Sequence, residues 1–426
     1  MRFTVPASAG TSKAPLTDAR VESMAITVTR EQVIAFRARR HHLTAPASDL
    51  ASAAGACGIG DSPPGAALLA LGARLPTLTA QDVDDALESG ALIRTWSMRG
   101  APFLLPVADL PVFTTGVLGA TEGVRAQLIR GVIPALVTLD LTLDEAVARC
   151  RDAVTEVLAG RRLPIGPLGA EAAAAIAPRL SAERRPHWLA EGPHAPGQPL
   201  GEAVVHFCLR ILTLERLVCF APREGNTAPF VLCGEWLGDV PAVDPERARA
   251  ELVRRYLRCY GPSTRRDFAA WLGVRTGDTG GWWSLIDDEL TAVDYDGEAW
   301  LLTADLDDLR DSPAPRGVHL LPALDPYLGQ RDRATIVDPA HHRAVFTNVG
   351  GPGAVLVDGR VAGTWRPRKR GSRLTLTVTE FAALTDEVQS RLTPSAEHMA
   401  SLRGADAVDI VTAAVATPRK PRRRAP

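Results

Sequence analysis

The sequence lacks several features that mark whole classes of protein. Its 426 residues carry a formal net charge of −1, so the chain as a whole has no electrostatic attraction for nucleic acid. No apolar run approaches the length of about 18 residues that spans a bilayer, and the N-terminal residues lack the apolar core of a signal peptide. We therefore expect a cytoplasmic protein with no membrane partner.

Motifs for metals and common cofactors are also missing. The six cysteines form no Cys-x-x-Cys pair, which argues against a zinc site or a disulfide framework and favours small buried side chains. The histidine pairs His41–His42 and His341–His342 have no further ligand at metal spacing, and we interpret them as surface or helix-end residues. P-loop, Gly-x-Ser-x-Gly and dinucleotide fingerprints are absent as well. The sequence thus predicts neither a metal nor a cofactor.

What is present is a repeated order of elements. A chain of this length exceeds one compact core, so several domains are expected. Residues 29–43 have helical spacing, with Thr29 as the capping residue, and further short helices lead to ALIRTWSM and APFLLP, two apolar segments around a tight turn. The same order of helices and hairpin recurs at residues 142–236 and 244–304. Helices followed by a hairpin are typical of a winged helix, and three successive units indicate a tandem array.

The C-terminal third changes character. LLPAL, AVFTNV, GAVLVDGRVAGTW and RLTLTVTEF alternate or are continuously apolar around Gly-rich turns, which predicts a small antiparallel, barrel-like β domain, followed by a helix near 383–403. The predicted fold class is α+β. We divide the chain into a disordered segment at 1–25, winged-helix units at 26–118, 119–241 and 242–316, the β domain with its closing helix at 317–405, and a basic tail at 406–426.

Charge is segregated along the chain. The third hairpin region is acidic and would repel phosphate, whereas RPRKRGSR places a basic cluster at a predicted β-turn. Such a cluster is either a solvated face or, on the loops of a winged-helix array, a surface for DNA phosphates. A polybasic run at 419–424 either adds nonspecific DNA affinity or has no role. The residues that we expect to contact the DNA backbone are Arg94, Arg99, Arg265, Arg266, Arg366, Arg368, Lys369 and Arg370.

Four blocks carry a resemblance to a known family: GALIRTWSMRGAPFLLPVADL, YGPSTRRDFAAWLGV, LLPALDPYLGQRDR and VLVDGRVAGTWRPRKRG. In this order the chain resembles the bacterial winged-helix DNA glycosylases of the azinomycin-resistance type (AlkZ/YcaQ-like). The resemblance implies three winged helices and a β-barrel-like part around a basic channel for double-stranded DNA. It also implies removal of alkylated purines, including cross-linked ones. With this reading we expect a nucleoid-associated protein, and we favour a monomer.

The chain departs from the family at the catalytic signature. The family's Gln-x-Gln motif falls on Gly60, Asp61 and Ser62, so both glutamines are missing. Asp61 could activate a water and stabilise the positive charge of an oxocarbenium-like transition state, with Ser62 assisting. Alternatively, both residues cap the helix that begins near residues 64 and 65. Residues 101–103 also replace the Thr-Leu-His of many members, so no role of that histidine transfers.

Two further groups leave alternatives open. Asp325 and Tyr327, with Arg331 and Arg333, form either a structural ion pair at a domain junction or part of a site. The tryptophans at 282 and 283 either belong to the core or stack on a flipped base.

Three functions remain open at this point. The leading hypothesis is base excision in alkylation-damage repair, without metal or cofactor. The second is a catalytically inactive DNA-binding protein that shields lesions or regulates transcription. The third is a module that binds small molecules or proteins.

Overall fold

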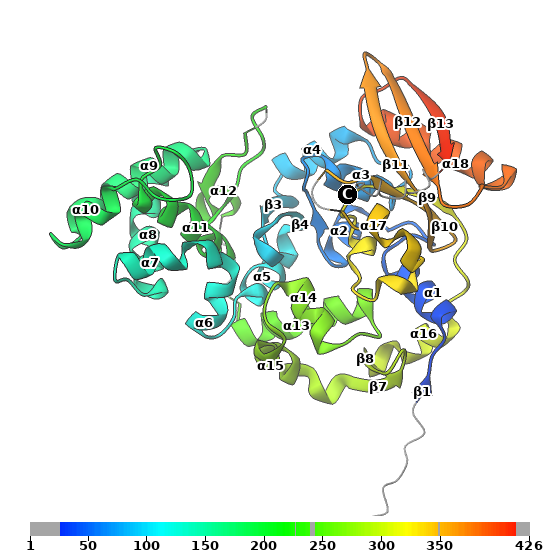
Figure 1. Cartoon of the computed structure of the whole chain (residues 1–426), viewed down its shortest axis with the longest axis horizontal. Coiled ribbons are helices and arrows are strands. Elements are labelled where there is room, and N and C mark those ends of the chain that lie inside the picture. Colours follow the sequence, from blue (N-terminus) through cyan, green and yellow to red (C-terminus); the bar gives the residue numbers. More distant parts are fainter. Residues whose placement is uncertain (1–25, 226, 239–242, 348–349, 415–426) are drawn as a thin grey trace, which may run out of the picture.

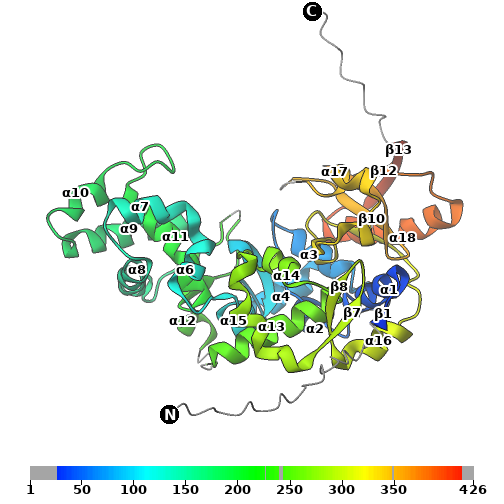
Figure 2. The same ribbon diagram turned by 60° about the horizontal axis from the view of Figure 1, so that its bottom comes forward.

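The computed structural model describes residues 26–225, 227–238, 243–347 and 350–414. The segment 1–25 and the end of the tail, including its basic run, lie outside the described residues. The fold is mixed α+β, as predicted. Most of the second predicted unit forms one end of an elongated molecule, the C-terminal sheet lies at the other end, and the first and third units lie between them (Figures 1 and 2).

The first region contains the predicted helices and hairpin. Helix α1 begins after Thr29, whose side chain and that of Gln32 form a reciprocal capping box, as the sequence predicted. Thr79 and Asp82 form a second capping box at the start of α4. The elements are α1 (Arg30–Arg40), α2 (Leu50–Gly55), β2 (Ile59–Gly60), α3 (Ala66–Gly72), α4 (Ala80–Glu88), β3 (Leu92–Trp96) and β4 (Pro102–Pro106).

The second region is mostly helical and ends in the predicted hairpin. Its elements are α5 (Leu110–Phe113), α6 (Glu122–Arg125), α7 (Ile133–Thr138), α8 (Leu143–Leu158), α9 (Ile165–Ile176), α10 (Arg184–Leu189), α11 (Leu200–Leu214), β5 (Val218–Phe220), β6 (Phe230–Leu232) and α12 (Cys233–Leu237). Among the described residues, no single helix is long and apolar enough to cross a membrane. One bent pair, Glu122–Thr138 with Leu143–Leu158, passes by length and composition alone.

The third region follows the same order, but its sheet also includes a strand from the beginning of the described chain. Its elements are α13 (Pro245–Tyr260), α14 (Arg265–Leu272), α15 (Gly280–Trp283), β7 (Leu290–Asp294), β8 (Glu298–Leu302) and α16 (Leu306–Asp311). Strand β1 (Ile26–Thr27), which we assigned to the first unit, pairs in parallel with β7. Trp282 and Trp283 are each 1% exposed, so the core interpretation of this pair is confirmed.

The first two hairpins share one sheet, which the sequence did not predict. The strand order is β2-β4-β3-β5-β6, and β3 meets β5 at the pair Arg94–Phe220. Buried residues from the first, second and third regions pack into one continuous apolar cluster. The helix-then-hairpin order is therefore present in each region, whereas their classification as separate winged helices and the proposed boundaries remain predictions.

The C-terminal part corrects several expectations. Strands β9 (Val318–Leu321), β10 (Gly353–Val357), β11 (Arg360–Arg370), β12 (Arg373–Glu380) and β13 (Ala407–Ala414) form an open sheet in the order β13-β12-β11-β10-β9, so it is not barrel-like. It is not purely antiparallel either, because β13 pairs in parallel with β12 after the helix α18 (Asp386–Leu402). Residues 407–414 thus belong to the sheet and not to a tail. The AVFTNV segment, predicted as a strand, contributes to the short helix α17 (His342–Val345).

Candidate functional site

The Gly-Asp-Ser stretch continues an antiparallel pairing. Gly60 in β2 pairs with Phe103 in β4, and the Asp61 amide donates to the Pro102 carbonyl at 2.8 Å. Since successive side chains of an extended chain point to opposite sides, Gly60 and Ser62 share one side and Asp61 faces the other. Gly60 and Ser62 accordingly line a cavity of about 80 Å³, while Asp61 is buried on the opposite side with 1% exposure.

The Asp61 carboxylate is fully engaged in local contacts. Its Oδ1 accepts from the amides of Gly65 (3.0 Å) and Ala67 (3.3 Å), at the start of α3. Its Oδ2 accepts from Nε of Arg94 at 2.7 Å. These are the contacts expected of the capping alternative. The role of Asp61 as water activator remains a prediction, and the buried carboxylate is absent from the lining of the cavity.

Replacement of this carboxylate measures the structural role directly. We expect Asp61→Ala to lower the free energy of unfolding by about 1–3 kcal/mol, because it removes the cap and leaves Arg94 without its carboxylate. DNA affinity should stay unchanged. Urea unfolding and a DNA titration provide the two readouts, and Asp61→Asn, which keeps a cap acceptor, is the milder control. Loss of base excision with unchanged stability would instead assign Asp61 to catalysis.

The cavity beside Gly60 has an aromatic floor. Tyr260, Trp271 and Phe103 contribute rings from α13, α14 and β4, and each is nearly buried. A Cβ built on Gly60 would meet no atom within 4 Å, so the missing side chain leaves open space. The complete lining is Cys57, Gly58, Gly60, Ser62, Arg99, Ala101, Pro102, Phe103, Tyr260, Trp271, Leu324, Asp325, Pro326 and Gly329. We call this cavity the turn pocket.

One arginine, Arg99, lines the turn pocket, and Arg331 lies near it. Arg99 lies at the hairpin turn with a left-handed φ of 58°, and its Nη1 donates to the Trp271 carbonyl at 2.6 Å. Burial and the positive charge of Arg331 lower the pKa of Arg99. Burial and Arg331 also lower the pKa of Arg333. Arg331 donates to the Ala270 carbonyl at 2.9 Å, and the Arg333 guanidinium lies 4.3 Å from the centroid of the Phe346 ring. No salt bridge is found for these three arginines among the described residues, so an anion beside Arg99 and Arg331 would relieve their mutual repulsion.

The block around Asp325 has a structural role, with a partner that we did not anticipate. Arg74 at the end of α3 makes a bidentate ion pair with Asp325, with both distances 2.9 Å. The two side chains are 1% and 0% exposed. Burial alone would lower the pKa of Arg74, but the Asp325 carboxylate outweighs it and raises this pKa. The structural interpretation of Asp325 is confirmed, but Arg331 and Arg333 are not its partners.

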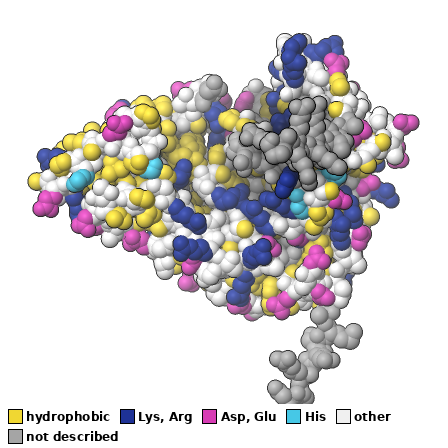
Figure 3. Space-filling view, viewed as in Figure 1, with side chains coloured by type: hydrophobic (Ala, Val, Ile, Leu, Met, Phe, Trp, Pro, Cys, Tyr) yellow, Lys and Arg dark blue, Asp and Glu magenta, His cyan; other side chains and the backbone are white. Residues whose placement is uncertain are grey.

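The remaining predicted DNA contacts fall into two groups. Arg94 is mostly buried against Asp61, and Arg265 lies 3.5 Å from Asp287, whereas Arg266 is exposed at the start of α14. The basic residues of the β11–β12 hairpin are exposed, and Figure 3 shows Lys and Arg side chains at its tip and over the middle of the same face. The exposed hairpin residues named from sequence are Arg366, Arg368, Lys369 and Arg370.

A second cavity lies between the β11–β12 hairpin and the residues that follow the Gly-Asp-Ser stretch. It has a volume of about 530 Å³ and is lined on one side by Pro63 and Pro64, directly after Ser62, and on the other by Trp365 and Lys369. The Lys369 ammonium donates to the Arg403 carbonyl at 2.8 Å, which holds it over this opening. The basic hairpin and the turn therefore border one continuous surface.

The acidic region of the third unit binds arginines of the protein itself. Asp305 and Asp308 both accept from Nη2 of Arg40 at 2.6 Å, and Glu289 accepts from Arg254. These pairs tie α1 and α13 to the third hairpin and to α16. The acidic cluster thus has a structural use, and it gives no reason to place DNA on this side.

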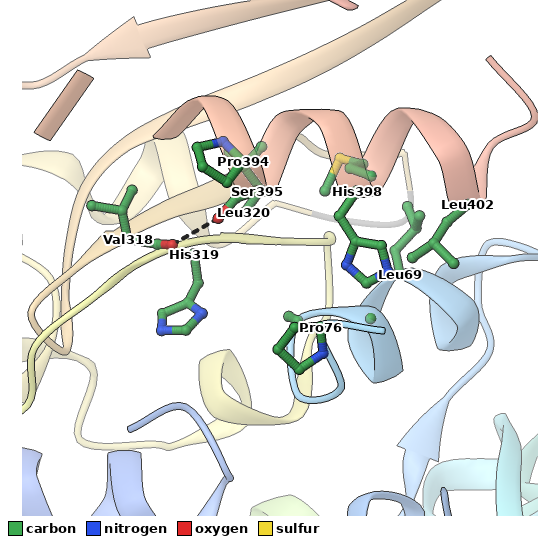
Figure 4. A pocket seen from close by; sticks show the side chains of 12 residues that line it. Leu69, Pro76, Val318, His319, Leu320, Pro394, Ser395, His398 and Leu402 are labelled. Atoms are coloured by element: carbon green, nitrogen blue, oxygen red, sulfur yellow. Dashed lines mark hydrogen bonds between the residues drawn. The ribbon is translucent and has the colours of Figure 1, made fainter. Parts of the chain in front are cut away.

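A third cavity, of about 270 Å³, lies between α3, β9 and α18. Figure 4 shows α18 above α3, with His398 reaching from α18 toward Pro76 and with the Ser395 hydroxyl donating to the Val318 carbonyl at 2.9 Å. His398 Nε2 lies 2.9 Å from the Leu78 carbonyl. The lining of this third cavity is mainly apolar. We therefore interpret the cavity as a gap left where the C-terminal helix α18 packs on the first unit.

The structure corrects the interpretation of His41 as a surface residue. His41 is the C-cap of α1, in agreement with a helix-end position, but it is only 2% exposed. All six cysteines are buried and free, as expected. Two of the cysteines, Cys57 and Cys259, lie beside His41. Together these three residues form the one group of potential metal ligands found among the described residues. Its ligands come from distant parts of the chain, so no sequence spacing could reveal it.

Comparisons with known proteins agree with this architecture. A solved structure, the DNA glycosylase AlkZ of Streptomyces sahachiroi, matches with a TM-score of 0.72 at 22% identity, covering 91% of this chain and 100% of that one. An interstrand DNA cross-link repair glycosylase of the same organism is 28% identical over 359 residues, which cover 78% of this chain and 86% of the relative. The family model described as DNA glycosylase AlkZ-like matches residues 53–402. The chain therefore belongs to the AlkZ-like family of DNA repair glycosylases.

Proposed function

We propose that the protein binds double-stranded DNA carrying an alkylated or cross-linked purine and takes the altered base into the turn pocket. The observation that carries this proposal is the position of Gly60 and Ser62. These residues, at the positions where the resemblance places the family's glutamines, both line a cavity that also contains aromatic rings and Arg99. Aromatic rings stack on an extruded base, and guanidiniums hold the backbone phosphates that flank it.

The chemistry expected at this pocket is modest. A purine alkylated at N7 is cationic, so its glycosidic C–N bond is already weakened. Cleavage releases the base with the bonding electrons, and water adds to the anomeric carbon and loses a proton to solvent. The enzyme must hold this water and stabilise positive charge on the sugar. Ser62 presents a hydroxyl to the pocket, so we assign it the orientation of water in a slow base excision.

A second candidate function is favoured by the burial of Asp61. Asp61 is engaged by Arg94 and two backbone amides and lies outside the pocket lining. Asp325 does line the pocket but is paired with Arg74, so the described lining offers no free carboxylate as general base. The protein would then be a DNA-binding protein that shields lesions without excising them. Both candidates predict lesion binding, and they differ only in product formation.

One assay separates the two candidates. The purified protein is incubated with a duplex containing a single 7-methylguanine, and abasic sites are revealed by alkaline cleavage against a no-enzyme control. Excess abasic product that falls in Ser62→Ala supports slow excision. Salt-dependent binding without excess product supports the shielding function. Equal affinity for the lesion duplex and its undamaged counterpart would contradict both.

The arginines beside the turn pocket should dominate DNA affinity. We expect the double variant Arg99→Ala/Arg331→Ala to weaken binding about tenfold and to reduce the salt dependence by about one to two phosphate contacts, since each phosphate neutralised releases counterions. Fluorescence anisotropy at several salt concentrations measures both effects. Charge reversal at Lys369 and Arg370 should act in the same direction.

The matched control is Arg151→Ala. Arg151 pairs with Glu215 at 2.6 Å on the second unit, far along the chain from the turn pocket, and its loss should leave the affinity unchanged. An equal reduction in this control and in the Arg99/Arg331 variant would show that the effect reflects overall charge and not a defined phosphate site.

A further inference from the structure

Three side chains of the kind that bind soft metals meet in the interior. His41 ends α1, Cys57 lies in the turn before β2, and Cys259 is in the last turn of α13. One ligand atom from each lies within 4.8 Å of the other two, and each residue is only 2% exposed. The cluster therefore brings together the first and third units.

The distances around Cys57 suit side chains that share one ion. Nδ1 of His41 lies 4.0 Å from the Cys57 sulfur, and the Tyr260 hydroxyl donates to the same sulfur at 3.7 Å. Cysteine sulfur and imidazole nitrogen are the preferred ligands of zinc.

Aromatic rings hold the His41 imidazole in place. It packs edge-on against Tyr260 and Tyr327, at centroid distances of 5.1 and 5.4 Å. Nδ1 is the ring nitrogen beside the Cys57 sulfur, and the other nitrogen, Nε2, is buried without a hydrogen-bond partner. In this orientation the ring offers Nδ1 to the ion.

The other cysteines provide an internal comparison for this cluster. Cys150, Cys208, Cys219 and Cys233 are all buried and free. None of them belongs to a group of three metal-type ligands among the described residues. Loss of the Cys150 thiol should therefore leave metal binding unchanged.

We propose that His41, Cys57 and Cys259 bind a zinc ion that ties α1, the turn before β2 and α13 together. Binding forms bonds from zinc to two sulfurs and one nitrogen, and the thiol protons leave to solvent. The Tyr260 hydroxyl contacts the Cys57 sulfur but also donates to the Pro326 carbonyl at 2.8 Å, so the fourth position falls to water.

The experiment uses the full-length reduced protein without an affinity tag. It is incubated with zinc, desalted, and its metal content is measured by mass spectrometry; cobalt is then titrated and followed by absorbance, because thiolate–cobalt charge-transfer bands report sulfur ligands. The variants are Cys57→Ser, Cys259→Ser and His41→Asn, with Cys150→Ser as the matched control. Circular dichroism and melting curves with and without chelator establish that each variant folds.

We expect about one zinc per chain in the wild type and in Cys150→Ser, with at least a tenfold weaker retention in the three ligand variants. Chelator should lower the melting temperature of the wild type and of the control. The proposal is overturned if the wild type retains no zinc after desalting, or if cobalt gives only the spectrum of the hydrated ion. Both readouts use the wild type, so they remain decisive even where a variant fails to fold. Neither depends on DNA binding or base excision, so the outcome is independent of the proposed function.

Discussion

The double variant Gly60→Gln/Ser62→Gln should excise 7-methylguanine at least about tenfold faster than the wild type, which corresponds to about 1.4 kcal/mol of transition-state stabilisation. Alternation along the extended chain places both new side chains on the pocket side, and a Cβ at Gly60 has no neighbour within 4 Å. Two amides aimed at the pocket would orient water and accept the developing positive charge through their carbonyl dipoles. Single-turnover kinetics on the lesion duplex measures the gain.

The control for this variant keeps the volume and removes the amide. Gly60→Leu/Ser62→Leu should bind the lesion duplex no better than the wild type and should show no gain in excision. The glutamine variant could bind DNA normally and still yield no more abasic product than the leucine variant. That result would show that the pocket does not hold a base within reach of positions 60 and 62. The single variants distinguish the contribution of each site.

The second large effect concerns the buried ion pair between α3 and the C-terminal segment. Arg74→Met should lower the free energy of unfolding by about 3–5 kcal/mol, because it leaves the Asp325 carboxylate buried without its partner. Urea denaturation followed by circular dichroism measures the loss. Asp325 Oδ1 retains only the Tyr327 amide at 2.9 Å, which is too little to compensate for a buried charge.

Removal of both charges tests whether the loss comes from the orphaned carboxylate. Arg74→Met/Asp325→Leu should recover most of the stability lost in Arg74→Met, since well-packed apolar residues often replace a buried ion pair without net cost. A double variant as unstable as the single one would show instead that the bidentate geometry itself, or the bond from Arg74 Nη1 to the Ala70 carbonyl, holds the two segments together.

Local signals in the sequence predicted the local structure well. Thr29 and Gln32, which cap α1, and the apolar segments on either side of Arg99, which form the β3–β4 hairpin, lie within a few residues of one another. Pairings between distant segments had no comparable signal. The joining of β3 to β5 depends on one ladder pair between residues 94 and 220. The AVFTNV segment has a high strand propensity, yet its first two residues, Ala344 and Val345, belong to the helix α17, where Val345 is buried.

The candidate site was predictable in part. The sequence drew attention to Asp61 and Ser62, and their alternative roles as caps or catalysts were both stated. The sequence alone did not predict that Asp61 and Ser62 face opposite sides, because their orientation depends on the pairing of Gly60 with Phe103. Arg331 was noted only as part of an ion pair, since its proximity to Arg99 arises from folding. The cluster around His41 shows the same limit most clearly, because Cys259 in α13 meets His41 and Cys57 only in the folded chain.

The parallel strand β13 has a practical consequence for any shortened form of the protein. A chain cut after residue 405, three residues beyond the end of α18, would expose the full length of β12 as an unpaired edge, with the hydrogen-bonding groups that face β13 left open. Such an edge is a template for intermolecular pairing and aggregation. Material intended for crystallisation or binding assays should therefore retain the chain through Ala414, even where the residues after it are removed.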